Sequence, residues 1–178
     1  MQRTRRALRE ALFAAILERG WDDVSVQDVC ARANVGRSTF YTHFVDKQEL
    51  LLSGFDDLHG ELRALVAREG GKPLGFVRAM IEHVHEHRRL RALVGKRGGQ
   101  AVLKRLTQLV VDLLEEEVAE TAAPGAQRDA AVRYMAGAFV ELLTWWSNTR
   151  SRLSAAELDE LYRRLTLPVL RELRRGER

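Results

Sequence analysis

Hydrogen-bonding side chains are concentrated in a short stretch, Arg37 to His43, that contains no aliphatic residue. It reads RSTFYTH and supplies a guanidinium, three aliphatic hydroxyls, a phenol and an imidazole. Phe40 and Phe44 stand four positions apart, so on a helix they share one face and leave the polar side chains on the other. Arginine can fork onto guanine acceptors, and hydroxyls and methyls can meet base edges or phosphates. The stretch therefore has the chemistry of a DNA-binding surface.

Residues on either side of this stretch could hold a DNA backbone. Ser25 starts a helical pattern and forms a capping-box-like pair with Asp28, and Lys47 follows the polar stretch. Serine, lysine and tyrosine are phosphate-contacting side chains. The basic segment 3–6 could also reach DNA, in a minor groove or on phosphates, although a solvated tail is equally consistent with the sequence.

The elements that must position these side chains are all predicted to be helices. Apolar residues recur three and four positions apart, and alternation typical of strands is nearly absent. Gly20, the glycine pair at 70–71 and the Pro124–Gly125 pair punctuate the pattern, and Pro168 should kink or end the last helix. We expect helices over about residues 4–19, 25–33, 36–44, 46–69, 73–89, 90–94, 99–120, 126–149 and 154–174.

Two of these helices are separated by the short turn Asn34–Gly36, a length that sets helices roughly perpendicular. This is the helix-turn-helix arrangement. The sequence therefore predicts an all-α protein with a three-helix helix-turn-helix DNA-binding domain over residues 1–50. A larger helical domain should occupy residues 51–178.

The segment from about Arg6 to Leu51 resembles the DNA-binding domain of TetR-family transcriptional regulators. The residues that carry the resemblance are Gly20-Trp21, Ser25-Val26, Ala33-Asn34-Val35-Gly36, Ser38-Thr39-Phe40-Tyr41-Thr42-His43-Phe44 and Asp46-Lys47-Gln48-Glu49-Leu50-Leu51. The chain departs from the family pattern at Trp21, Cys30 and Asn34, and none of these is a DNA-facing position.

The resemblance implies two roles for residues of the polar surface, contact with bases and contact with the DNA backbone. Arg37, Ser38, Thr39 and His43 would approach bases or nearby phosphates, whereas Tyr41, Lys47 and Ser25 would hold the backbone; Thr42 lies on the same outward face. Which of the first group reads a base stays open.

The segment from Tyr134 to Trp146 is apolar nearly all round its helix and should be covered on more than one side. By resemblance, the last two long helices pair with those of a second subunit in a four-helix bundle. A dimer also follows from geometry, because two recognition helices one DNA turn apart require a two-fold operator. The plausible contact residues are Ala136, Gly137, Val140, Leu161 and Leu165.

The resemblance also implies that a small-molecule effector enters a cavity in the C-terminal domain and changes the spacing of the DNA-binding heads. Ordinary core packing explains the candidate residues at least as well, because methionine and aromatic residues at helical spacing are usually core. The candidate lining residues are Phe76, Met80, His83, His87, Leu106, Val110, Phe139, Leu143 and Trp146.

The sequence favours neither a metal site nor a cofactor. His83 and His87 lie one helical turn apart, but no HExxH order, nearby cysteine or third ligand accompanies them. Glu141, within the apolar segment, is best explained as solvated or paired with an arginine such as Arg133. Cys30 is the only cysteine, so an intrachain disulfide is excluded.

Charge and hydropathy agree with a DNA-binding protein without requiring one. The net charge of +4 and a pI near 9.6 mildly favour a polyanionic partner. No signal peptide is recognised, and the longest mostly apolar stretch, 134–146, is too short for a bilayer, which needs about 20 residues. We expect a cytoplasmic protein with no membrane partner.

The leading hypothesis is a repressor that binds a palindromic double-stranded DNA operator as a homodimer and is released by an effector. Activation instead of repression stays possible. One alternative is a helical adaptor or ligand-binding protein whose helix-turn-helix does not read DNA. Another, a small helical enzyme, has no recognisable nucleophile–base pair, metal cluster or phosphate loop, so we expect no enzyme.

Overall fold

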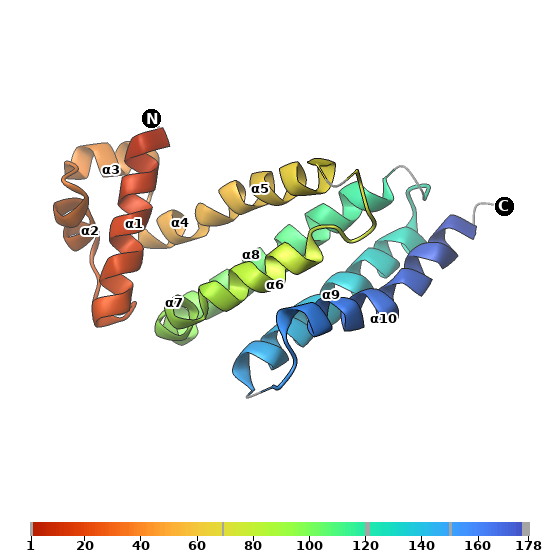
Figure 1. Ribbon diagram of the computed structural model, residues 1–178. Coiled ribbons are helices and arrows are strands. Elements are labelled where there is room, and N and C mark those ends of the chain that lie inside the picture. The colour runs from red at the N-terminus through yellow and green to blue at the C-terminus, as the bar shows by residue number, and fades with distance from the viewer. Residues whose placement is uncertain (1, 69, 120–121, 150, 176–178) are drawn as a thin grey trace. The chain divides into compact units, whose positions relative to one another are not determined.

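The computed structural model describes residues 2–68, 70–119, 122–149 and 151–175, and every regular element in these ranges is a helix. The all-α prediction is confirmed, since none of the described residues lies in a strand. The helices, labelled in Figure 1, are α1 (Gln2–Arg19), α2 (Val26–Ala33), α3 (Arg37–His43), α4 (Lys47–Leu52), α5 (Gly54–Arg68), α6 (Val77–Glu86), α7 (Arg88–Leu93), α8 (Gly95–Val118), α9 (Ala126–Asn148) and α10 (Ala155–Arg175).

The chain divides into two compact units. Unit 1 consists of Met1–Leu58 and His87–Arg105, and unit 2 consists of His59–Glu86 and Leu106–Arg178. Unit 1 therefore includes α7 and the first part of α8, in addition to the helices expected to bind DNA. The units describe packing, and the functional boundary at residue 50 stays a prediction.

Unit 1 is built around α1, which packs against α2, α4 and α7. Its core joins residues from all of these helices, and Gly20, at φ 83°, ends α1 in the left-handed region. The core residues of unit 1 are Leu8, Ala11, Leu12, Ala15, Ile16, Trp21, Val24, Val29, Cys30, Phe40, Phe44, Leu50, Leu51 and Val94.

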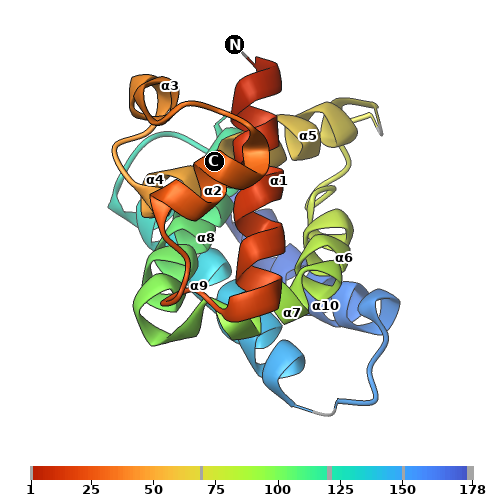
Figure 2. The same ribbon diagram turned by 90° about the vertical axis from the view of Figure 1, so that its left-hand side faces the viewer.

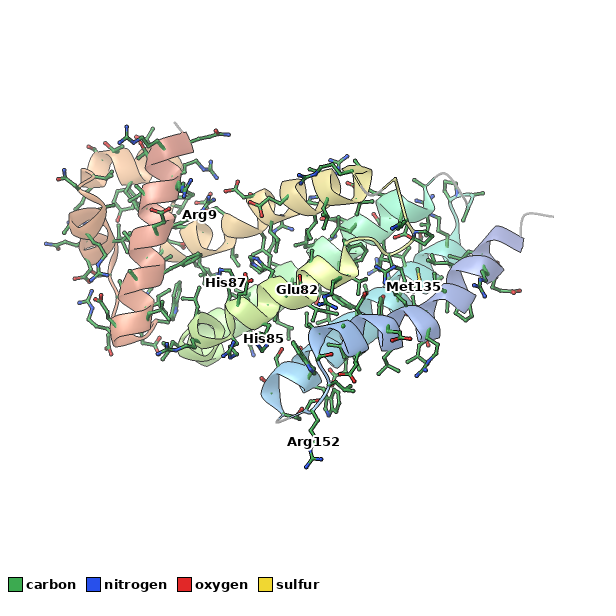
Figure 3. All side chains as sticks on the ribbon, viewed as in Figure 1. Arg9, Glu82, His85, His87, Met135 and Arg152 are labelled. Carbon is green, nitrogen blue, oxygen red and sulfur yellow. The ribbon has the colours of Figure 1, made fainter. Side chains whose placement is uncertain are left out.

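The single helix expected over 46–69 is interrupted at Ser53. The buried Ser53 hydroxyl donates to the Leu50 carbonyl at 2.8 Å, and the Arg9 guanidinium donates to the Ser53 carbonyl at 3.3 Å. Figure 3 shows Arg9 projecting from α1, and the same guanidinium pairs with Asp57 in α5. Arg9, on α1, thus donates to the backbone carbonyl at the break. The spacing of apolar residues within a helix does not predict such a contact.

In unit 2, the helix expected from Pro73 begins only at Val77, because the preceding turn has its own structure. Leu74 is fully buried at φ 58°, a left-handed conformation that costs roughly 1–2 kcal/mol for a residue with a side chain. Its N–H donates to both carboxylate oxygens of Glu117, at 2.9 and 3.0 Å. Arg163 donates to the carbonyls of Pro73 and Leu74, both at 2.7 Å. Helices α8 and α10 thus clamp the turn.

Pro168 does not end the last helix, contrary to one of the two expected outcomes. Helix α10 continues through it to Arg175. Pro168 is exposed, whereas Tyr162, Thr166 and Leu170 are buried along the helix, so packing on one face is maintained across the missing N–H.

The core of unit 2 is centred on aromatic rings from two helices, α9 and α10, and from the turn before α6. Phe139 lies between Phe76, at 6.2 Å between ring centroids, and Tyr162, at 4.9 Å. The Tyr162 hydroxyl donates to the Met135 carbonyl at 2.9 Å, and burial raises the pKa of this phenol. No helix within the described residues is long and apolar enough to cross a membrane.

Replacing Tyr162 by Phe should lower the free energy of unfolding by about 0.5–1.5 kcal/mol, because a buried hydrogen bond is lost while the ring remains. Tyr41→Phe, measured without DNA, is the matched control, since Tyr41 is 53% exposed on α3. Urea unfolding followed by circular dichroism measures both. Equal stability of the two variants would contradict the role given to the Tyr162 hydroxyl.

Candidate nucleic-acid interface

The turn between α2 and α3 has the geometry expected for a helix-turn-helix. Asn34 caps α2 in the left-handed region, at φ 53°, ψ 46°, and its N–H reaches the Ala31 and Cys30 carbonyls. Gly36 then adopts an extended conformation and is the N-cap of α3. Asparagine tolerates a left-handed conformation better than other side chains, which explains its place where glycine is common.

Phe40 and Phe44 anchor α3 to the rest of unit 1, as predicted. They are 0% and 2% exposed, and their ring centroids are 5.8 Å apart. Burying one phenylalanine contributes about 1.5–3 kcal/mol, more than a typical net 0.5–1.5 kcal/mol for a hydrogen bond. The two rings, and not the polar side chains, therefore determine which face of α3 meets solvent.

The opposite face of α3 presents the polar residues that the sequence singled out. Tyr41 is 53% exposed, and His43 is half-buried. The Thr42 hydroxyl donates to the Ser38 carbonyl at 3.0 Å, which leaves its oxygen able to accept. The exposed residues of this face are Arg37, Ser38, Thr39, Tyr41 and Thr42.

Ser25 is fully engaged in the predicted capping box. Its hydroxyl accepts from the Asp28 N–H at 3.2 Å and donates to an Asp28 carboxylate oxygen at 2.5 Å. Its own N–H donates to the same oxygen at 2.8 Å. These bonds hold the pKa of Asp28 at about 2. A phosphate contact by Ser25 stays a prediction, and helix capping accounts for every bond shown.

Lys47 is also bound within unit 1. Its ammonium donates to the Trp21 and Val24 carbonyls, both at 2.7 Å, and lies 4.4 Å from the centroid of the Trp21 ring. Burial lowers the pKa of Lys47, opposed by the charges of Asp22 and Asp23. Its predicted role as a phosphate anchor stays a prediction.

The basic segment 3–6, left open by the sequence, lies within α1. The Arg5 guanidinium lies over the Phe44 ring, 5.0 Å from its centroid, and Arg6 pairs with Glu10 at 2.8 Å. Figure 2 shows α3 beside the N-terminal part of α1. Arg5 is thus a basic residue next to the recognition helix that the sequence alone did not place there.

The predicted effector-pocket residues fall mostly in the interior of unit 2. His83 is half-buried, and His87 is exposed and belongs to unit 1. The ring of His85 lies 5.2 Å from that of Trp146 between centroids, and the Trp146 indole N–H donates to the Leu153 carbonyl at 2.8 Å. The buried members are Phe76, Met80, Leu106, Val110, Phe139, Leu143 and Trp146.

Two side chains central to this interior, Tyr162 and Glu117, were absent from the predicted set. A carboxylate such as that of Glu117, which binds a turn more than forty residues away, leaves no periodic signal in the sequence. Among the described residues, no group of three or more His, Cys, Asp or Glu side chains is placed to hold a metal ion.

The predicted dimer residues are divided between the interior and the surface. Ala136 and Val140 are 1% and 8% exposed, so the chain itself already covers them. Gly137 is exposed, Leu161 is half-buried and Leu165 is 61% exposed.

Comparison with known proteins agrees with this geometry. Residues 8–53 match a family model described as "Bacterial regulatory proteins, tetR family". A TetR transcriptional regulator from Streptococcus agalactiae 2603V is 25% identical, with 93% of this chain and 94% of that chain covered and a TM-score of 0.61.

Two other solved structures share the fold at lower identity. NalD, described as the secondary repressor of the MexAB-OprM multidrug efflux pump in Pseudomonas aeruginosa, is 19% identical over 94% of this chain and 96% of that chain, with a TM-score of 0.60. The dihydroxyacetone kinase operon activator DhaS is 16% identical over 96% of each chain, also at 0.60.

The capped α2, the left-handed turn at Asn34 and the anchored α3 define a helix-turn-helix protein of the DNA-binding class. The resemblance predicted from the sequence is confirmed: residues 8–53 match the TetR-family model, and the chain is similar over most of its length to a solved TetR transcriptional regulator.

Asp28→Asn should lower the midpoint of thermal unfolding at pH 7, because the charged acceptor of the Ser25 box is lost. The folded pKa, about 2, lies below the ordinary 3.8. The stabilisation by the carboxylate is thus fully present well above pH 3.8 and is lost as the pH falls through about 2.

Scanning calorimetry from pH 7 to pH 2.5 measures this difference. The difference in unfolding midpoint between wild type and Asp28→Asn should become smaller as the pH falls. Glu61→Gln, which removes an exposed carboxylate from α5, is the control. A difference in unfolding midpoint that does not change with pH would show that the charge of Asp28 does not stabilise the N-terminus of α2.

Proposed function

We propose that the protein represses transcription by binding a two-fold symmetric DNA operator as a homodimer, and that a small-molecule effector bound in unit 2 releases it. The observation that carries the proposal is the outward face of α3. Five polar residues are exposed there, while Phe40 and Phe44 hold the opposite face in the core. An α-helix of this kind fits the major groove, with polar side chains reaching base edges.

Within this docking mode, Arg37 begins α3 and is suited to a bidentate contact with guanine. Tyr41 and Arg5 lie where they could meet phosphates on either side of the groove, since Arg5 stacks on Phe44 at the end of α3. Aspartates and glutamates accompany the arginines in this module, so affinity should depend on placement and on two copies binding together.

The homodimer is supported by the apolar side chains that α9 and α10 expose. Tyr134 and Trp145 on α9 are 62% and 45% exposed, and Leu165 on α10 is 61% exposed. Helices α9 and α10 run side by side in unit 2 (Figure 1). We therefore propose an interface built on these three side chains with Gly137 and Leu161, in place of the covered Ala136 and Val140.

Release by an effector requires that effector and DNA favour different arrangements of the two heads, so that each lowers the affinity for the other. Seven of the nine candidate lining residues, all except His83 and His87, are hydrophobic and buried, which suits a small apolar effector. We propose repression as the direction of regulation. NalD is described as a repressor and DhaS as an activator, and this chain's similarity to each concerns the fold alone.

The double variant Arg37→Ala, Tyr41→Ala should weaken binding to a duplex that the wild type selects by about tenfold or more, since one good base contact is worth about 1–3 kcal/mol. Fluorescence anisotropy over a salt series measures the affinity. Arg152→Ala is the control, because Arg152 is exposed and points away from the helices of unit 2 (Figure 3). Unchanged binding by the double variant would contradict the docking mode and favour a protein-binding adaptor.

Leu165→Glu should convert the dimer to a monomer and lower operator affinity, because a two-fold interface receives the buried charge twice. Sedimentation velocity at micromolar concentration measures the oligomeric state. Leu17→Glu is the matched control, since Leu17 is 48% exposed on α1, in unit 1. A Leu165→Glu variant with an undisturbed dimer would place the interface elsewhere.

A further inference from the structure

Unit 1 holds a contact between sequence-distant segments that the DNA-reading surface does not explain. Trp21, at the turn between α1 and α2, is 6% exposed and belongs to the same core as Phe40. It touches both the corner between α7 and α8 and the first residue of α4, which follows the recognition helix.

On the side of α7 and α8, the contact is a hydrogen bond and a close approach. The Trp21 N–H donates to the Leu93 carbonyl at 3.1 Å. Gly98, in the first turn of α8, is buried, and a Cβ added there would lie 3.4 and 3.5 Å from the indole and would overlap a methyl group of Val94. A side chain at position 98 would therefore collide with Val94 inside the corner, in a place that also borders the indole.

On the side of α4, the contact is electrostatic. The Lys47 ammonium lies 4.4 Å from the indole centroid, within range of a cation–π interaction, and donates to the Trp21 and Val24 carbonyls. Two of its three N–H donors are thus used within the protein. Lys47 is the first residue of α4, only four positions beyond the last residue of α3.

We propose that Trp21 is a positioning residue for DNA binding: Gly98 and Lys47 set the orientation of α3 through it, and Lys47 acts on the protein and not on a phosphate. The inference rests on the proposed function, because it concerns how the DNA-reading helix is held. It makes the α7–α8 corner part of the DNA-binding body.

The test separates positioning from phosphate binding by the salt dependence of affinity. Each phosphate neutralised contributes about 0.9 to the slope of log affinity against log salt. Lys47→Met should weaken duplex binding and leave this slope unchanged. Arg152→Met, which removes an exposed charge from unit 2, is the control for net charge and should bind as the wild type does.

Gly98→Ala should weaken binding on the order of two- to thirtyfold at unchanged slope, the range that 0.5–2 kcal/mol of indirect coupling produces. Gly99→Ala is the matched control, because a Cβ at that neighbouring glycine meets nothing within 4 Å. It should bind as the wild type does. Circular dichroism confirms that each variant is folded.

Wild-type affinity of a folded Gly98→Ala variant would overturn the inference, and so would a slope for Lys47→Met that falls by about 0.9. If Gly98→Ala does not fold, the Lys47→Met slope alone decides between these outcomes. Failure of the wild type to bind any duplex would overturn the proposed function together with this inference. If the wild type binds a duplex and the folded Gly98→Ala variant binds it with the same affinity, the inference alone is overturned.

Discussion

The burial of two phenylalanine rings, Phe40 on the seven-residue helix α3 and Phe44 at its C-cap, is the constraint on which the DNA-reading surface depends. A helix as short as α3 has little stability of its own and must be held by tertiary packing. Phe40 and Phe44 provide that packing, and their spacing of four residues fixes the helix rotation. The other side chains can then be chosen for hydrogen bonding, because none of them is needed to hold the helix in place.

The same division between anchoring and exposed side chains recurs in unit 2. Tyr162 and Phe139 fill the interior, and Glu117 with Arg163 clamps the turn before α6 from two helices. Helix α9 nevertheless leaves Tyr134 and Trp145 at its surface. A helix that is apolar nearly all round thus has one side buried within the chain and apolar side chains exposed on another.

Local patterns in the sequence predicted the anchored recognition helix, the capping box at Ser25, and most helix boundaries. These features depend on residues three or four positions apart. The break at Ser53 and the left-handed Leu74 were not predicted, because each depends on a partner more than forty residues away, Arg9 or Glu117. Gly98 and Gly99 look equivalent in the sequence, and only the close approach of Val94 and Trp21 to Gly98 distinguishes them.

If two copies of α3 read DNA together, the DNA that the protein selects must have two-fold symmetry. Duplexes bound by the purified protein would be recovered from a random pool and sequenced. A two-fold dimer should select an inverted repeat whose half-sites are centred about one helical turn apart, or a multiple of one turn. Recovery of a single asymmetric motif, or no enrichment at any salt concentration, would contradict this prediction.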